Sequence, residues 1–437
     1  MSATRLVIVD GVRTPFSKMG TDLAHLGADE LGRIAVSALL ARTGIDPAII
    51  DEVIFGCVAQ PADAANVARV IALRAGIPEH VPAITVHRNC ASGCEAITQA
   101  QEKMLAGRGS IFVVGGTESM SQVPLLFTMR AAQKFAKLSR AKSMWQRIGA
   151  MAAFRPSDFT PRIGLQLGLT DPVCGLNMGE TAEVLAREFG LSRELQDAFA
   201  VESHARALAA RDKIAEEICP VYPTLNVERA RGKTSGTVME DNGPRKDQTL
   251  EILGKLRPVF EKRTGTVTAG NSSQITDGAV ALLVMTEQKA TEMALTPLGI
   301  LTGYAYAGCD PTRMGLGPVF AIAKAEEVTG LTTDHADLIE INEAFAAQVL
   351  AVLKCLRSDE FAAKFLRRSR HVGKISKERL NVNGGAIALG HPVGATGARL
   401  ALTSLKELAR RQAKRALVSL CVGGGQGAAL WLERPQL

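Results

Sequence analysis

Two cysteines and a histidine lie in sequence contexts that suit a nucleophile and the acid and base groups of a catalytic site. Cys90 lies in RNCASGCEA, between an apolar run ending at Val86 and an expected helix beginning near Gly93. A thiol at such a turn faces the free N–H groups of the helix, which favour a thiolate and can hydrogen-bond an oxyanion. The sequence thus offers Cys90 as a nucleophile, although a buried, inert cysteine is the commoner fate of this residue type.

His391 lies in a glycine-rich bend, NVNGGAIALGHPVGATGAR, between an expected strand and an expected helix. The glycines permit positive φ and close backbone approach, and Pro392 stiffens the bend beside the imidazole. A lone histidine is usually structural or solvated. The glycines and Pro392 around this imidazole indicate a specially formed bend, which favours a catalytic base here.

Cys421 ends an apolar run that continues into CVGGGQGAAL. The segment lacks the Gly-Lys-Ser/Thr of a Walker loop, and a strand rather than a helix is expected after its glycines, which argues against a dinucleotide site. Bare backbone N–H groups beside a thiol suit an oxyanion pocket instead. Asn342, in EINEAFAAQ, also ends an apolar run. It is either a helix N-cap or an amide that holds a water or polarises a carbonyl, and the sequence slightly favours the cap.

The elements that must position these groups alternate between short apolar runs and helical patterns, which predicts an α/β fold with a mixed or parallel sheet. Strands are expected at residues 6–9, 52–56, 83–86, 111–114, 279–285, 299–306, 337–341, 380–382, 416–421 and 428–432. Helices are expected at residues 23–42, 66–75, 93–106, 192–212, 287–293, 320–329, 343–356 and 397–410. The alternation breaks between residues 121 and 255.

The two ends of the chain resemble each other. Ser92-Gly93, a helix and IFVVGG parallel Thr396-Gly397, a helix and LVSLCVGGG. Two linked features in the same order predict an internal duplication. We expect one half at 1–121 with 256–290, a second half at 291–437, and an inserted loop domain at 122–255. The duplication also places Cys90 and Cys421 in equivalent regions, which would let them meet beside His391 near a pseudo-twofold axis.

The net charge of +7 is concentrated in one segment of the 437-residue chain. Eight basic residues and one acid lie between Met129 and Arg162, so the remainder is balanced. With 4% aromatic residues, this distribution argues for a local anionic contact and against nucleic-acid binding. No apolar run reaches the length of a membrane span, and the N-terminus lacks a signal-peptide pattern, so we expect a cytoplasmic protein with free thiols.

Five motifs stand together in order: CASG, GTVTAGNSSQITDGA, NEAF, GGAIALGHPVGATG and CVGGGQG. With them the chain resembles the thiolase family from Val7 to Leu432. The resemblance implies two βαβαβαββ halves in a five-layered αβαβα core with a loop domain. It also implies that coenzyme A (CoA) is a substrate and that no metal or redox cofactor is bound.

The same resemblance implies a role for each candidate. Cys90 is the acylated nucleophile, His391 activates it, and Cys421 moves the proton of the acetyl α-carbon or of the leaving thiol. Asn342 matches the residue that positions a water in one oxyanion hole. The N–H groups of Cys90 and Gly423 match the other.

Further matches concern CoA, which the loop domain would hold. Ser273 in AGNSSQ matches a serine that contacts the pantetheine, and Met178 in NMGETAE matches a methionine at the thioester end. Phe345 is expected to line the same pocket. Many thiolases carry histidine where this chain has Asn177.

The expected activity is degradative 3-ketoacyl-CoA thiolysis in fatty-acid oxidation. A short-chain acetoacetyl-CoA thiolase shares all the catalytic residues, and a decarboxylative ketoacyl synthase is a third, weaker reading because such enzymes use histidine where Cys421 stands. The loop segment AAQKFAKLSRAKSMWQRIGAMAAF resembles the β-subunits of trifunctional complexes. The basic stretch 130–162 is therefore expected to face a hydratase/dehydrogenase subunit, a membrane surface or the CoA phosphates. A homodimer or a dimer of dimers is expected from the family.

Overall fold

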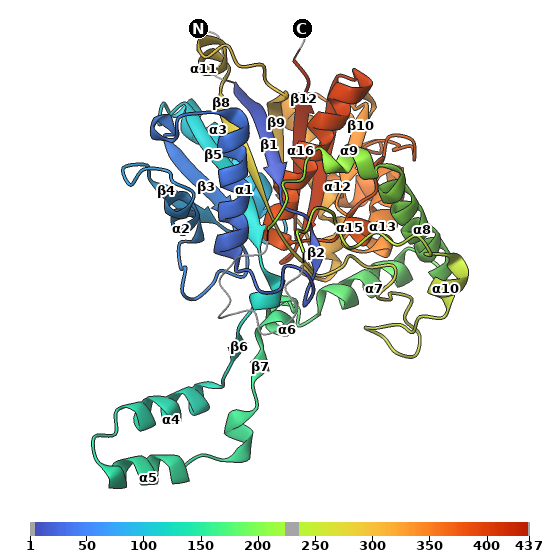
Figure 1. Ribbon diagram of the computed structural model, residues 1–437. Coiled ribbons are helices and arrows are strands. Elements are labelled where there is room, and N and C mark those ends of the chain that lie inside the picture. Colours follow the sequence, from blue (N-terminus) through green and yellow to red (C-terminus); the bar gives the residue numbers. More distant parts are fainter. Residues whose placement is uncertain (1–4, 223–235, 436–437) are drawn as a thin grey trace. The chain divides into compact units, whose positions relative to one another are not determined.

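The structure is a computed structural model that describes residues 5–222 and 236–435 (Figure 1). The chain divides into two compact units, Val123–Thr170 and the rest of the chain on either side of it. In the larger unit, the first part contains β1 (Leu6–Arg13), β2 (Ser17–Lys18), α1 (Ala28–Thr43), β3 (Glu52–Gly56), α2 (Val67–Arg74), β4 (Ala83–Val86), α3 (Ser92–Leu105) and β5 (Ile111–Glu118). It continues with α7 (Met178–Glu188), α8 (Arg193–Ala209), α9 (Arg211–Ala215), α10 (Leu250–Gly254), β8 (Thr276–Thr286) and α11 (Glu287–Glu292).

The C-terminal part of the larger unit repeats the alternation. It contains β9 (Gly299–Gly308), α12 (Gly317–Thr329), β10 (Leu338–Ile341), α13 (Ala346–Leu356), α14 (Asp359–Phe361), α15 (Ala386–Leu389), α16 (Val393–Arg411), β11 (Arg415–Val422) and β12 (Gln426–Glu433). Among the described residues, no helix is long and apolar enough to cross a membrane.

The strand pairings confirm the predicted duplication. The strand order is β4-β3-β5-β8-β1 in the first half and β9-β12-β11-β10 in the second, with β1 and β9 in brief contact. The parallel pair β3–β5 corresponds to β10–β11, and the antiparallel pairs β5–β8 and β8–β1 correspond to β11–β12 and β12–β9. The strand expected at 380–382 does not form, because only Leu380 makes a bridge, to Ile339.

Three apolar clusters show how the layers stack. One cluster joins α1 and α2 to the first half of the sheet, and another joins α12 and α13 to the second half. The third lies between them and contains α3 and α16 together with side chains from both halves of the sheet, such as Val114 and Val418. The layer order is therefore helix, sheet, helix, sheet, helix, which is the predicted five-layered core.

The central layer depends on a close crossing of α3 and α16. A Cβ built on Gly397 would lie 2.5 Å from the Cys94 backbone nitrogen, and one built on Gly93 would lie 2.6 Å from the Ala398 nitrogen. These are the two glycines that mark the internal repeat. Each half thus contributes one glycine to let the two helices approach.

We expect Gly397→Ala to lower the free energy of unfolding by about 1–3 kcal/mol or more, because the methyl group meets backbone atoms that cannot rotate away. Denaturant unfolding measures the loss. Gly254→Ala is the matched control, since a Cβ there meets nothing within 4 Å. Equal stability of the two variants would contradict a tight crossing.

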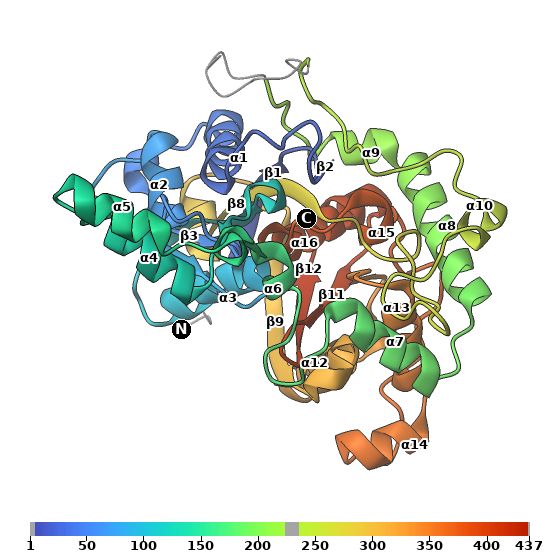
Figure 2. The same ribbon diagram turned by 90° about the horizontal axis from the view of Figure 1, so that it is seen from below.

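Between β5 and β8 the chain holds more helices than predicted. The predicted helix at 192–212 is confirmed as α8, with Ser192 as its N-cap: the hydroxyl accepts the Leu195 N–H at 3.3 Å. Helices α7, α8 and α10 form a group beside the second half, where α7 and α8 contact α13 and α8 contacts α15 (Figure 2). The predicted limits of the loop domain stay a prediction.

The smaller unit is an antiparallel ribbon of β6 (Leu125–Leu126) and β7 (Arg162–Ile163), with α4 (Met129–Ser139) and α5 (Met144–Ala152) between its strands and α6 (Gly164–Gly168) after them. Four phenylalanine rings pack together inside it: Phe127, Phe135, Phe154 and Phe159. The basic stretch forms two helices here, because the chain breaks at residues 140–143 and Ser143 caps α5.

Candidate active site

Cys90 occupies a tight turn between β4 and α3. Asn89 before it has a left-handed backbone with φ of 44°. Ser92 closes the turn, because its hydroxyl accepts the Arg88 N–H at 2.9 Å and donates to the Asn89 carbonyl at 2.7 Å. Cys90 itself is half-buried, so it is the most accessible of the predicted catalytic side chains.

The Cys90 sulfur meets the backbone of the second half. The backbone N–H groups of Gly423 and of Cys90 itself lie close enough to the sulfur to lower the pKa of its thiol. These are the two donors that the family resemblance assigns to an oxyanion hole. Burial nevertheless raises the pKa of the Cys90 thiol, and the two N–H groups only partly offset that rise. The backbone N–H groups thus favour the thiolate, as the sequence indicates, but burial outweighs them and the nucleophile is a thiol at neutral pH.

Cys421 lies at the end of β11 and is 1% exposed. Burial raises the pKa of its thiol well above the ordinary value, and the nearby Cys90 raises it further. The two thiols thus lie within electrostatic reach of each other, as the sequence predicted. Cys421 is protonated at neutral pH, which suits a group that donates a proton.

His391 has its tautomer set by Thr396. Its Nδ1 lies 2.6 Å from the Thr396 hydroxyl, and that hydroxyl donates its single proton to the Pro392 carbonyl at 2.9 Å. The hydroxyl must therefore accept from Nδ1–H, which leaves Nε2 as the unprotonated nitrogen. Burial, with Arg399 nearby, lowers the pKa of His391 to about 3, so the imidazole is neutral.

Asn342 lies beside His391 and is not a helix cap. Its Nδ2 lies 3.4 Å from His391 Nε2, whereas α13 begins only at Ala346 and the cap position belongs to Phe345. The expected N-cap role is therefore wrong. The Asn342 Oδ1 is buried and has no partner among the described residues. Since such an oxygen is costly to leave unpaired, it is available to a water or a substrate.

Two buried carboxylates that the sequence analysis missed hold the loops of the site. Glu118, at the end of β5, accepts backbone N–H groups from Val58, Ala59 and Gly394, so it joins the first half to the start of α16. Glu343 accepts from Ser203, Asn381 and Ile387. Their only sequence signal is an acidic residue next to an apolar run, in GGTES and EINEAF.

The residues predicted to contact CoA lie around the same loops. A Cβ on Gly423 would lie 3.5 Å from the Met178 sulfur. Phe345 is 9% exposed and stacks edge-on against Phe260 with ring centres 6.1 Å apart. Ser273 donates its backbone N–H to the Ala344 carbonyl at 2.9 Å. Their contacts with CoA stay a prediction.

Asn177, where many thiolases carry histidine, has a structural role. Its side chain accepts the Gly179 N–H at 3.0 Å, and Glu180 completes a capping box at the start of α7.

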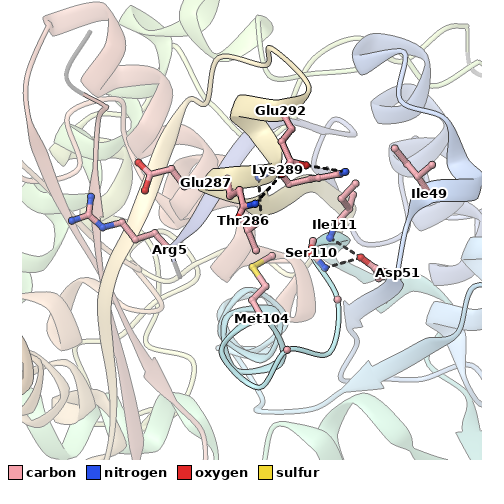
Figure 3. A pocket seen from close by; sticks show the side chains of 13 residues that line it. Arg5, Ile49, Asp51, Met104, Ser110, Ile111, Thr286, Glu287, Lys289 and Glu292 are labelled. Carbon is pink, nitrogen blue, oxygen red and sulfur yellow. Dashed lines mark hydrogen bonds and ion pairs between the residues drawn. The ribbon is translucent and has the colours of Figure 1, made fainter. Parts of the chain in front are cut away.

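A cavity of about 600 Å³ lies away from these residues. Figure 3 shows its lining, which includes Arg5, Asp51, Ser110 and Lys289. Asp51 accepts the N–H groups of Ser110 and Ile111, which ties the chain before β3 to the start of β5. None of the predicted catalytic or CoA-contacting residues lines this cavity.

Known proteins match the chain from end to end. Residues 6–288 match the family model of the thiolase N-terminal domain, and residues 295–434 match that of the C-terminal domain. The 3-ketoacyl-CoA thiolase of Serratia proteamaculans is 40% identical over 98% of this chain and 97% of its own length. That of Yersinia pestis strain Pestoides F is also 40% identical, over 98% and 97%.

Solved structures agree with the fold. The human mitochondrial 3-ketoacyl-CoA thiolase in complex with CoA superposes with a TM-score of 0.83 at 36% identity, covering 99% of each chain. The Bacillus anthracis acetyl-CoA acetyltransferase superposes with a TM-score of 0.84, also at 36% identity and 99% of each chain. Together with the duplicated five-layered core, these matches show that the chain belongs to the thiolase family.

Proposed function

We propose that this protein is a 3-ketoacyl-CoA thiolase, which uses CoA to cleave a 3-ketoacyl-CoA into acetyl-CoA and an acyl-CoA two carbons shorter. The observation that carries the proposal is the meeting of the Cys90 turn with the Gly423 turn, which the Asn89 Nδ2 bond to the Gly423 carbonyl joins at 2.8 Å, with Cys421 near enough to Cys90 for its pKa to be raised by it. The His391–Asn342 pair adds a neutral base to the same family site. The reaction runs in reverse as a Claisen condensation.

In the first half-reaction, the Cys90 sulfur attacks the 3-keto carbon while His391 Nε2 takes the thiol proton. The bond between the α and β carbons then breaks, and its electron pair forms the enolate of acetyl-CoA. Cys421 donates a proton to the α-carbon, and His391 returns its proton to the Cys421 thiolate. The shortened acyl group stays on Cys90 as a thioester, so little energy is lost.

In the second half-reaction, CoA enters as a thiol and gives its proton to His391. The CoA sulfur attacks the acyl carbon, the bond to Cys90 breaks, and the leaving thiolate regains the proton. Because acetyl-CoA leaves before CoA attacks, the kinetics are ping-pong. Each donor that points at the developing oxyanion is worth about 10²- to 10³-fold in rate, and the N–H groups of Cys90 and Gly423 are proposed to take this role.

The rival function is short-chain cleavage of acetoacetyl-CoA, and the superposition on an acetyl-CoA acetyltransferase keeps it open. Thiolysis rate measured against acyl chain length separates the two. We expect turnover of substrates with longer acyl chains. A sharp preference for acetoacetyl-CoA would replace the degradative assignment with the short-chain one.

Ser273, Met178 and Phe345 are proposed to line the CoA and thioester pocket, with no metal in the chemistry. Their placement around the Gly423 turn and the Asn342 loop supports this. The proposed location is cytoplasmic.

We propose a homodimer because β4, at one edge of the sheet, is available to pair with a second copy of the chain. Strand β4 ends the strand order, and it leaves Ile84 42% exposed in a strand of otherwise apolar character. Unpaired edges of this kind favour pairing with a second copy. Light scattering should give the dimer mass or a multiple of it.

The basic stretch of the smaller unit is proposed to face an anionic lipid surface, with a hydratase/dehydrogenase subunit as the alternative partner. Met144, Trp145 and Ile148 are exposed on α5, and the exposed Lys137, Arg140 and Lys142 lie at the end of α4 and in the connection to α5. That combination is typical of interfacial helices. Lys134 does not take part, because it pairs with buried Asp158 at 2.5 Å.

Changing Lys137, Arg140 and Lys142 together to glutamine should weaken binding to anionic vesicles by about 3 kcal/mol, on the order of 100-fold, because each basic residue near such a surface is worth about 1 kcal/mol. Vesicle co-sedimentation measures this. Glutamine at the exposed Lys255 and Lys377 of the larger unit is the control. Unchanged vesicle binding would remove the lipid proposal, and a weakened pull-down of a hydratase/dehydrogenase subunit would favour the alternative.

A further inference from the structure

Asn89 links the nucleophile turn of the first half to the glycine turn of the second. Its side-chain Nδ2 donates to the Gly423 carbonyl at 2.8 Å, across 334 positions of sequence. Its own carbonyl accepts the Ser92 N–H at 3.0 Å and the Ser92 hydroxyl at 2.7 Å. One residue therefore closes the turn that presents Cys90 and also contacts the partner turn.

The backbone conformation of Asn89 allows it both to close the Cys90 turn and to contact Gly423. Its φ of 44° lies in the left-handed region, which asparagine adopts more readily than most non-glycine residues. The side chain that tolerates this conformation is also a good hydrogen-bond donor. A glycine would serve the turn equally well but could not reach Gly423.

Gly423 needs an external support. It has no side chain, and Gly424 and Gly425 after it have φ of 85° and 76°. A Cβ on Gly423 would lie 3.6 Å from Asn89 Nδ2, so the amide packs directly against it. The Gly423 N–H lies close enough to the Cys90 sulfur to lower the pKa of the thiol, while the Gly423 carbonyl is held by Asn89. Without the bond from Asn89 to its carbonyl, Gly423 would be free to rotate about its backbone bonds and to turn its N–H away from the sulfur.

We propose that Asn89 is a positioning residue: by holding the Gly423 carbonyl it fixes the peptide after Gly423 and limits rotation at this glycine, so that the Gly423 N–H stays directed at the Cys90 sulfur and at the oxyanion formed there. The proposal rests on acyl transfer at Cys90. Oxyanion donors are effective because they are already oriented before the charge develops, and a shift of about 0.5 Å is enough to weaken them. Asn89 itself does not touch the reacting atoms in this account.

Asn89→Gly tests the proposal, because it keeps the left-handed backbone and removes only the amide. We expect kcat for thiolysis to fall about 10-fold, less than the loss of a whole donor, with KM for CoA nearly unchanged. The pH midpoint for alkylation of Cys90 by iodoacetamide should move upward, because the thiolate loses part of its Gly423 hydrogen bond. A merely structural residue would move neither quantity.

Asn89→Asp is the second variant, since it keeps the size and the tolerance for this backbone but places an acceptor against the Gly423 carbonyl. Its kcat should fall at least as far as that of Asn89→Gly. Asn66→Gly is the control, because Asn66 makes the same kind of bond, Nδ2 to the Ala83 carbonyl at 3.0 Å, away from the sulfur.

Wild-type kcat and an unshifted alkylation midpoint in Asn89→Gly would overturn the proposal, as would a loss of melting temperature alone. Failure of the proposed function would look different, since the wild-type protein would then cleave no 3-ketoacyl-CoA. The alkylation midpoint needs no turnover, so it tests Asn89 in either case.

Discussion

Replacing Cys90 with alanine is expected to lower thiolysis by more than about 10⁴-fold, because no other group can hold the acyl chain between the half-reactions. Cys421 cannot substitute for Cys90. Its thiol is only 1% exposed, and burial raises its pKa well above that of an ordinary cysteine, so it forms little thiolate. The measurement is the loss of 3-ketoacyl-CoA absorbance in the presence of CoA.

The control is Cys174→Ala, which removes another half-buried free thiol. It should retain wild-type turnover and melting temperature. A Cys90→Ala protein that still cleaves 3-ketoacyl-CoA at a substantial rate would remove the covalent mechanism.

Replacing His391 with asparagine is expected to lower kcat by about 10²- to 10⁴-fold, the usual contribution of a positioned general base. Asparagine can donate toward the same pocket but cannot take the thiol proton. Because Cys90 rests as a thiol, every turnover needs that transfer. Stopped-flow measurement of acyl-Cys90 formation isolates the step, and a wild-type rate would show that the proton leaves by another route.

Thr396 provides a graded control for the histidine. Thr396→Val keeps the shape but removes the acceptor for Nδ1–H, so the tautomer with a free Nε2 is no longer favoured. We expect a loss of about 10-fold, smaller than that of His391→Asn. Thr396→Ser, which keeps the hydroxyl, should lose less than the valine variant.

The sequence predicted the fold well where local pattern and tertiary packing agree. The apolar runs became β1, β3, β5 and β8, and the paired glycines Gly93 and Gly397 marked the crossing of the two central helices. The run at 380–382 failed as a strand because Asn381 turns there with φ of 44°. A positive φ at a non-glycine residue is not readable from an apolar pattern.

We predicted that Cys90 and Cys421 meet because the duplication was expected to place them in equivalent regions. The structure corrects that reason. Cys90 precedes α3 as His391 precedes α16, whereas Cys421 ends β11, the counterpart of β5. The two thiols are therefore not at equivalent positions. They meet because the central helices begin at the same end of the sheets where β5 and β11 finish.

The protonation states and the supports of the site were not predictable from the sequence. A helix N-terminus favours a thiolate, but the burial that opposes it at Cys90 depends on tertiary packing, which a local sequence pattern does not show. Asn342 looked like a cap because it ends an apolar run before a helical pattern, whereas α13 begins only at Ala346, four residues later. Glu118, Glu343 and Asn89 act on backbone groups distant in sequence, which no local pattern shows.

The most direct test of the account is the mass of the protein mixed with a 3-ketoacyl-CoA in the absence of free CoA. We expect the peptide containing Cys90 to gain an acyl group two carbons shorter than the substrate acyl chain, with one acetyl-CoA released per site. Added CoA should then discharge the adduct as acyl-CoA. Turnover without an adduct, or an adduct on another cysteine, would contradict the account.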